Sequence, residues 1–258
     1  MNARLHAPLL AFALVGCSGL ARDGAAVPRW SGVMIERGVF RSATGCLLDT
    51  TRFQPRRPRT SDLAILAPGF LRDQRQLAGL ALALAGRGIP VVTLTFCNTS
   101  AWDGRPIRNA LDMMAVGRRL GATAVVYAGF SAGGLAALIA GRLDRHAVGV
   151  VALDLVDAQG LGVGMARALD RPLVGLAGAP AACNAYNNGL KVFAVAPRAS
   201  VTPIPWASHC DFESPTDWLC ESLCTGVDQG SAARRRTIVA ATVTAVSDLI
   251  GPLPPTGP

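Results

Sequence analysis

The sequence predicts an α/β fold in which a mostly parallel central sheet is flanked by helices, and three observations support it. The chain has 258 residues, enough for one sizeable domain with its own core. Half of its residues are hydrophobic and 16% are charged, which excludes a disordered chain. From about residue 30, short apolar runs alternate with helix-like stretches, the pattern of a parallel sheet covered on both faces.

Apolar runs and turn residues predict the elements in order. Residues 31–38 and 40–50 have strand-like patterns and predict an opening antiparallel pair, and the Pro- and Arg-rich stretch 51–60 predicts a loop. Continuous apolar runs then predict strands at 62–70, 89–96, 123–130, 147–156 and 171–178, with a short strand within 201–209. Helical stretches, one of them stopped by glycine, predict helices at 73–88, 106–121, 131–145, 163–169 and 231–251.

The N-terminus indicates export. Arg4 provides a basic start, and the apolar stretch that follows is too short to span a bilayer. It ends in Leu-Val-Gly-Cys17, which resembles a bacterial lipobox and implies that Cys17 is lipidated. The alternative is an ordinary secretory signal with a chance cysteine. Ser18 after the cysteine favours the outer membrane, so we expect a lipid-anchored protein of the bacterial cell envelope, at the outer membrane or in the periplasm.

These features divide the chain into four parts. We expect a signal peptide at 1–16, a linker at 17–30, one folded α/β domain at 31–251 and a disordered tail at 252–258. The formal net charge of +8 comes from scattered arginines, which is typical of a solvated surface rather than a nucleic-acid-binding stripe. We therefore expect no nucleic-acid partner, a monomer, and a membrane contact through the lipid anchor.

Cysteine usage also fits export. Without Cys17 an even number remains, which predicts disulfides in an oxidising compartment. These six cysteines are Cys46, Cys97, Cys183, Cys210, Cys220 and Cys224. They allow 15 pairings, and the sequence does not choose among them. The spacing Cys220-x-x-x-Cys224 could also suit zinc, but no second ligand pair stands at a suitable spacing, so we expect no metal.

A candidate nucleophile lies in the motif G-x-S-x-G around Ser131. The serine directly follows an apolar strand run and begins a helix, which is the context of a nucleophile elbow. Sites in parallel sheets form at the carboxyl ends of the strands, where Ser131 is expected. The helix N-terminus there would favour developing negative charge. The alternative is a small residue in a Gly/Ala-rich turn.

Position along the chain then selects a base. The sequence has three histidines. His6 lies in the signal segment, and His146 precedes a strand and is expected at the opposite edge of the sheet. His209, in a loop after the last short strand, is the remaining candidate.

The acid is expected between nucleophile and base, in the order Ser…Asp…His. Asp144 ends a helix and Asp170 precedes a strand, so both belong to the opposite edge. Asp154 stands at the tip of a strand on the active edge and is our choice for the acid. Asp157, a little further along, is the alternative acid, or else a loop or helix-capping residue.

An oxyanion hole needs two backbone N–H groups. We expect one from Ala132, after the nucleophile, and one from Phe70, where Gly69 allows a close approach of the backbone. Phe70, Phe130 and Trp206 are candidate walls of the substrate pocket. For Phe70 the alternative is packing in the core.

Together these residues resemble the α/β-hydrolase superfamily across nearly all of the mature chain, particularly its chlorophyllase-like and polyester-hydrolase-like (cutinase/lipase) branches. Pro-Gly-Phe70 matches the Pro-Gly-aromatic oxyanion stretch of the latter. The segment after the elbow resembles the Asp-Pro-Val segment of chlorophyllases, which implies that Asp154 is the acid, although Leu155 replaces the proline. The resemblance also suggests that stretches 183–189 and 208–220 form paired loops around His209, joined by a disulfide.

These observations predict an exported serine hydrolase that cleaves carboxylic esters through an acyl-enzyme, with no cofactor. The short connection between Asp154 and Arg171 leaves no room for a large lid domain. Two alternatives stay open. The same triad could cleave amides or thioesters, or the protein could be a catalytically inactive envelope lipoprotein with a binding role.

Overall fold

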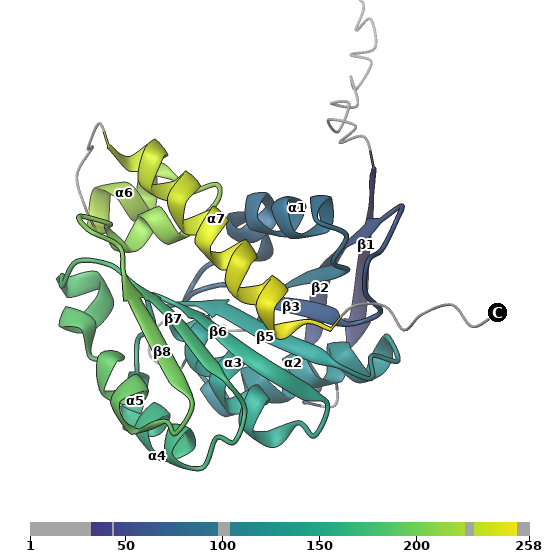
Figure 1. Cartoon of the computed structure of the whole chain (residues 1–258), viewed down its shortest axis with the longest axis horizontal. Helices are drawn as coiled ribbons and strands as arrows, with labels where there is room; N and C mark the ends of the chain where they lie inside the picture. The colour runs from purple at the N-terminus through teal and green to yellow at the C-terminus, as the bar shows by residue number, and fades with distance from the viewer. Residues whose placement is uncertain (1–31, 43, 98–103, 225–229, 252–258) are drawn as a thin grey trace, which may run out of the picture. The chain divides into compact units, whose positions relative to one another are not determined.

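The computed structural model describes residues 32–42, 44–97, 104–224 and 230–251 (Figure 1). The predicted signal peptide, Cys17, the linker and the tail 252–258 lie outside these ranges. Within the described residues, eight strands form one sheet in the order β1-β2-β4-β3-β5-β6-β7-β8. The strands are β1 Val33–Arg41, β2 Leu47–Pro55, β3 Leu63–Ala67, β4 Val91–Thr95, β5 Val125–Phe130, β6 Ala147–Leu153, β7 Leu173–Ala177 and β8 Ala199–Pro203.

The sheet is mostly parallel, as predicted. β2 pairs antiparallel with β1 and with β4, and the pairs from β4 through β8 are parallel. Strands β3 and β5 are buried at every position, which explains their continuous apolar sequences. The carboxyl ends of the parallel strands meet at one edge, and the loops after β3, β5, β6, β7 and β8 therefore leave the sheet on the same side.

One predicted boundary was wrong. Residues 51–55 were expected in a loop, but β2 continues through them to Pro55, which lies opposite Val33 of β1. Their alternation explains the strand: Thr51, Phe53 and Pro55 are buried, whereas the residues between them are partly exposed. The proline is tolerated because it stands at the last position of the strand.

Helices cover both faces of the sheet (Figure 1). The helices are α1 Ala78–Gly86, α2 Pro106–Arg119, α3 Ala132–Leu143, α4 Leu161–Arg167, α5 Leu190–Val195, α6 Trp218–Cys224 and α7 Ser231–Leu249. Helices α2 to α5 pack into one apolar core, and α1 and α7 pack into the other. None of the helices among the described residues is long and apolar enough to cross a membrane.

The sequence did not predict α5 or α6, which have six and seven residues and are too short for a clear helical period. The described residues also contain four short 3-10 turns. They are η1 Gln74–Leu77, η2 Ala158–Gly160, η3 Ala182–Asn187 and η4 His209–Phe212. Turns η3 and η4 both contact α6, so these two turns and the short helix lie together.

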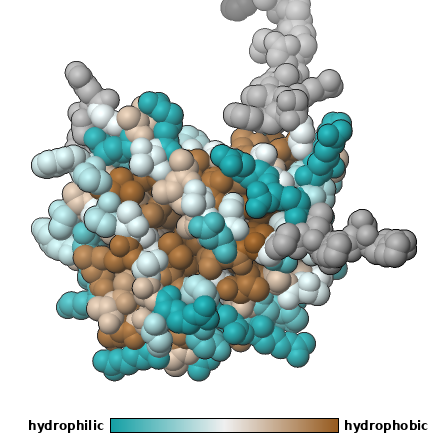
Figure 2. Space-filling view, viewed as in Figure 1, coloured by the Kyte–Doolittle hydropathy of each residue, from teal (hydrophilic) through white to brown (hydrophobic). Residues whose placement is uncertain are grey.

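The face shown in Figure 2 carries hydrophobic residues over its middle, with hydrophilic side chains around them. A cavity of about 530 Å³ lies between α1 and α7, with apolar walls that include Ala83 and Val239 and arginines at its border. Ser131 does not line this cavity, which is therefore separate from the candidate site described below.

Candidate active site

Ser131 occupies a sharp turn between β5 and α3. Its φ and ψ are 55° and −122°, a conformation that non-glycine residues rarely adopt and that is common at functional sites. The turn is held from the neighbouring strand, since the Ser131 N–H donates to the Leu153 carbonyl at 2.8 Å. The backbone thus presents the side chain at the carboxyl end of β5.

The glycines of the motif are required by close backbone contacts. A Cβ atom on Gly129 would lie 2.2 Å from the Gly133 carbonyl oxygen, and one on Gly133 would lie 2.3 Å from the Pro68 carbonyl oxygen. Real Cβ atoms do not approach backbone this closely, so any side chain at either position would force the turn apart. The motif is therefore the sequence that this turn requires.

A continuous chain of hydrogen bonds runs from Ser131 to Asp154. The Nε2 of His209 lies 3.0 Å from the Ser131 Oγ, and its Nδ1 lies 2.6 Å from the Asp154 Oδ2. Because an ionised carboxylate only accepts, Nδ1 carries the proton and donates it to Asp154. Nε2 is then the free acceptor and receives the hydrogen bond of the Ser131 hydroxyl.

The three side chains are buried, and those of Ser131 and His209 line a cavity. Ser131, His209 and Asp154 are 7%, 6% and 2% exposed. The ring of Phe130 packs on the imidazole of His209, with ring centroids 4.5 Å apart and planes tilted by 41°. Phe130, a candidate pocket wall in the sequence, therefore also supports the His209 ring on its apolar side.

Of the two candidate acids, the structure brings Asp154 to His209. Asp157 lies elsewhere: its Oδ1 accepts from the Gly162 N–H at 2.7 Å, and its backbone exchanges two hydrogen bonds with the Asn188 side chain. Asp157 thus accepts from an N–H group in the first turn of α4, while Gly160 holds the N-cap position of that helix.

Sequence reasoning missed Asn184, which is completely buried. Its amide nitrogen lies 3.4 Å and 3.2 Å from the two carboxylate oxygens of Asp154 and 2.8 Å from the Ala179 carbonyl. Its amide oxygen accepts from the N–H groups of Ala181 and Asn187, which fixes the orientation of the amide. Its place after β7, at the active edge, was the available signal.

A backbone group completes the surroundings of the acid. The Gly178 N–H, also after β7, donates to the Asp154 Oδ1 at 2.8 Å. Asp154 has a positive φ of 44°, which turns its side chain from the end of β6 toward this loop. With His209 and Asn184, every oxygen of the carboxylate has at least two partners.

The histidine and the aspartate assigned to the opposite edge lie there. The Nδ1 of His146 lies 3.0 Å from the Thr123 carbonyl oxygen, at the start of β5. Asp144 accepts from the Tyr127 hydroxyl at 2.5 Å. Burial raises the pKa of Tyr127 strongly, and the hydrogen bond to Asp144 raises it further, so this phenol stays protonated. Both groups are structural.

The candidate oxyanion groups flank Ser131. Ala132 is the first residue of α3, and Phe70 follows β3 by three residues. A Cβ atom on Gly69 would lie 3.0 Å from the Phe130 ring and 3.3 Å from the Ser131 Cβ, which shows how closely this loop approaches the serine. Phe70, Ala132 and Ser131 line a common cavity.

An ion pair anchors the loop that carries Phe70. Arg72 donates to both carboxylate oxygens of Glu213 at 2.6 Å and 2.7 Å, and it also pairs with Asp217 at 2.9 Å. Burial alone would lower the pKa of Arg72, but the bonds to Glu213 and Asp217 outweigh it, so its pKa is raised. The guanidinium therefore stays charged and joins the loop after β3 to the segment that follows His209.

Two cavities lie beside Ser131. One, of about 260 Å³, is lined by His209, Phe130 and residues of α6. The other, of about 360 Å³, is lined by Ala132 and by residues of α2, α3 and the loop after β6. Phe70 lines both.

Trp206, an expected pocket wall, lines neither of them and is 84% exposed, so that expectation was wrong.

The prediction of disulfides is confirmed, with all six cysteines paired. The pairs are Cys46–Cys97, Cys183–Cys224 and Cys210–Cys220. Of the two loops expected around His209, the second is closed on itself by Cys210–Cys220. The first is joined to α6 through Cys224, four residues beyond the second stretch.

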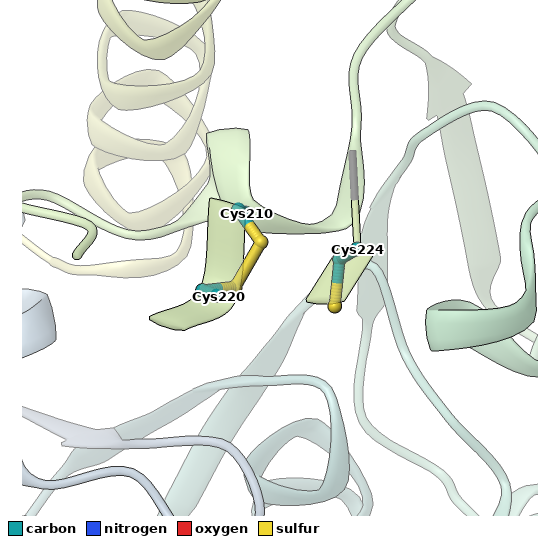
Figure 3. A group of neighbouring side chains, drawn as sticks. All are labelled: Cys210, Cys220 and Cys224. Atoms are coloured by element: carbon teal, nitrogen blue, oxygen red, sulfur yellow. A yellow bond between two sulfur atoms is a disulfide. The ribbon is translucent and has the colours of Figure 1, made fainter. Parts of the chain in front are cut away.

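The cysteines around α6 lie close together (Figure 3). The sulfur atoms of Cys210, Cys220 and Cys224 lie within 4.8 Å of one another, a spacing that free thiolates could use to bind a metal. Each of them is committed to a disulfide, and a disulfide sulfur is not the thiolate that zinc binds. The cluster is therefore a structural brace beside the site.

No protein-family model matches the sequence, and no curated protein matches it. Solved structures do match its fold. One is a PEG-bound cold-adapted esterase from an Arctic intertidal metagenomic library, 14% identical, covering 86% of this chain and 97% of that chain, with a TM-score of 0.64. Another is an alpha-beta serine hydrolase homologue from Coxiella burnetii, 15% identical, covering 82% and 97%, with a TM-score of 0.62. The chain therefore has the predicted α/β-hydrolase fold.

Proposed function

Starting from the α/β-hydrolase fold, we propose that this protein is a serine hydrolase that cleaves carboxylic esters through an acyl-enzyme. One observation carries the proposal: the unbroken hydrogen-bond chain from the Ser131 hydroxyl through His209 to Asp154, at the active edge of the sheet. A buried serine on a strained turn, bonded to an oriented imidazole, is the arrangement of an activated nucleophile.

The first half of the reaction forms the acyl-enzyme. The Ser131 Oγ attacks the carbonyl carbon of the ester while its proton passes to the His209 Nε2. Asp154 holds the imidazole in the required tautomer and stabilises the imidazolium that forms. When the tetrahedral intermediate collapses, the ester C–O bond breaks and His209 gives the proton to the leaving alcohol oxygen.

The second half releases the acid. Water attacks the acyl carbon, His209 takes one of its protons, and the proton then returns to the Ser131 Oγ as the acyl–oxygen bond breaks. In both halves the negative carbonyl oxygen is stabilised by the N–H groups of Phe70 and Ala132. No cofactor is needed for any step.

An ester substrate is supported by the apolar character of the two cavities and by the esterase among the structural neighbours. The test is hydrolysis of a panel of simple esters, thioesters and anilides by the wild type and by Ser131→Ala. The proposal expects ester turnover that the variant loses. Turnover of thioesters or anilides alone would replace the ester assignment, and no turnover of any substrate would favour a binding role.

We further propose that the protein is exported and anchored by a lipid on Cys17. The lipobox-like stretch before Cys17 supports this, and so do the three disulfides, which persist in oxidising compartments. Intact-mass analysis of protein extracted from membranes should show the loss of residues 1–16 and the added acyl groups. A soluble product cleaved at another position would refute the anchor.

A further inference from the structure

We propose that the two cavities beside Ser131 divide the substrate between them. The cavity of about 260 Å³ takes the alcohol portion, and the cavity of about 360 Å³ takes the acyl portion. Both portions are apolar. This assignment rests on the proposed ester hydrolysis and adds to it the class of substrate and the residues that select it.

The proton that His209 gives to the leaving alcohol identifies the cavity that binds the alcohol portion. His209 must give a proton to the alcohol oxygen, so that oxygen has to lie within hydrogen-bonding reach of Nε2. His209 lines the smaller cavity and does not line the larger one. The alcohol therefore extends along the smaller cavity, and the acyl group has to take the cavity on the Ala132 side.

The walls of the alcohol cavity are large apolar side chains. Leu219 and Leu223 of α6 and Leu71 line it, and they are 45%, 74% and 60% exposed. Exposed leucines gathered at a site mark a surface that gains from covering by an apolar group. Arg72 is the lysine, arginine or carboxylate side chain that lines this wall among the described residues, and it is paired with Glu213 and Asp217. It is therefore not available to select an anionic alcohol portion.

The acyl cavity has walls of smaller side chains, which are buried or half-buried at Pro106, Leu135, Val156 and Ala158. Val156 and Ala158 come from the loop after β6, Leu135 from α3 and Pro106 from the start of α2. Among the residues that the structure describes, no charged side chain lines this cavity. Its volume lies at the lower end of the range for small-molecule pockets, which suits a chain of moderate length rather than a bulky ring system.

Disulfides hold the alcohol wall in position. Cys220 and Cys224, both within α6, are bonded to Cys210 beside His209 and to Cys183 in the loop after β7. Helix α6 has only seven residues and one buried member, Cys220, so packing alone holds it weakly. The two bonds therefore fix Leu219 and Leu223 relative to the imidazole that must reach the alcohol oxygen.

Two series of esters separate the subsites. The acyl series is 4-nitrophenyl acetate, butanoate and octanoate, and the alcohol series is methyl, butyl and octyl butanoate. For each series kcat/KM gives a ratio of the longest to the shortest member. The acyl-side variant is Val156→Phe, with Ala158→Leu as a second should the first fold poorly. The alcohol-side variant is Leu219→Ala/Leu223→Ala, and Leu143→Ala, an exposed leucine at the end of α3, is the control.

We expect each variant to change one ratio. A methylene in an apolar pocket is worth about tenfold or more in kcat/KM. Val156→Phe should therefore lower the octanoate-to-acetate ratio at least about tenfold and change the octyl-to-methyl ratio by less than about twofold. Leu219→Ala/Leu223→Ala should do the reverse, and the Leu143→Ala control should change neither ratio.

Different results would refute the assignment of the cavities and the proposed ester hydrolysis. Ratios that respond in the opposite sense, or that both respond to both variants, would overturn the assignment while leaving ester hydrolysis in place. If the wild type hydrolyses neither series, the ester hydrolase itself is refuted. Circular dichroism of each variant establishes that it is folded.

Discussion

Arg72 and Glu213 are 141 residues apart in sequence and share two hydrogen bonds of 2.6 Å and 2.7 Å. Glu213 is fully buried, and Arg72 lies on the loop that carries Phe70. The pair therefore joins the proposed oxyanion loop to the segment that begins at His209. The contact therefore fixes the distance between the loop after β3 and the segment after β8, which carry Phe70 and His209.

Glu213→Gln should destabilise the fold and lower turnover together. Loss of a hydrogen bond to a charged group costs about 1.5 kcal/mol or more, and Asp217 remains beside Arg72 to limit the loss. The unfolding midpoint in urea should fall accordingly, and kcat should fall about tenfold as the Phe70 N–H loses its fixed place. Asp217→Asn is the matched control, since it removes the outer, more exposed partner of Arg72. A normal kcat in Glu213→Gln would contradict the positioning role of the pair.

Asn184 should support turnover through Asp154. Asn184→Ala removes the amide nitrogen that lies beside both carboxylate oxygens of Asp154, so Asp154 holds His209 less rigidly and kcat should fall about tenfold. Asn188→Ala, in the same loop but bonded to Asp157, should leave kcat unchanged. Saturation kinetics on both variants check this, and an unchanged kcat in Asn184→Ala would show that the amide does not position the Asp154–His209 pair.

Substitution of the two candidate acids, Asp154 and Asp157, should have clearly different effects on kcat. Asp154→Asn keeps the shape but removes the charge that stabilises the imidazolium, so kcat should fall at least about 10²-fold. Asp157→Asn keeps an oxygen that can accept from the Gly162 N–H, and turnover should stay within about twofold. Saturation kinetics on both variants, with circular dichroism as the check on folding, decide the matter. Collapse of kcat in Asp157→Asn alone would reverse the assignment.

Disulfides near to and far from the site should have different effects. Loss of either Cys183–Cys224 or Cys46–Cys97 by paired Cys→Ser changes should cost about 3 kcal/mol of stability, since the closed loops have similar lengths of 41 and 51 residues. Only the first bond borders the two cavities. We therefore expect a higher KM for octyl butanoate when Cys183–Cys224 is removed, and an unchanged KM when Cys46–Cys97 is removed. Equal changes in both would mean that α6 keeps its place without the bond.

Much of the arrangement around Ser131 could be predicted because it depends on local rules. A strand, a sharp glycine turn and a helix follow one another in the sequence around Ser131. Strand tips then place Asp154 at the same edge, and only one histidine remained for that edge. These inferences need only the position at which each parallel strand ends, and apolar runs followed by turn residues show that position in the sequence.

The parts that could not be predicted depend on distant contacts or on weak local patterns. Asn184 has no charge and no motif, so only the folded loop shows that it faces Asp154. Neither the partner of Arg72 nor the disulfide pairing is encoded in local sequence. Trp206 was expected as a pocket wall, but its φ is 60° and its side chain is 84% exposed.

The most direct test of the account is the site at which a serine-directed fluorophosphonate reacts. The reagent should add once per molecule of wild type, and peptide mapping should place the adduct on Ser131. Ser131→Ala should take up no label while keeping the circular dichroism spectrum of the wild type, and His209→Ala should be labelled far more slowly. Labelling at another serine, or undiminished labelling of Ser131→Ala, would contradict the account.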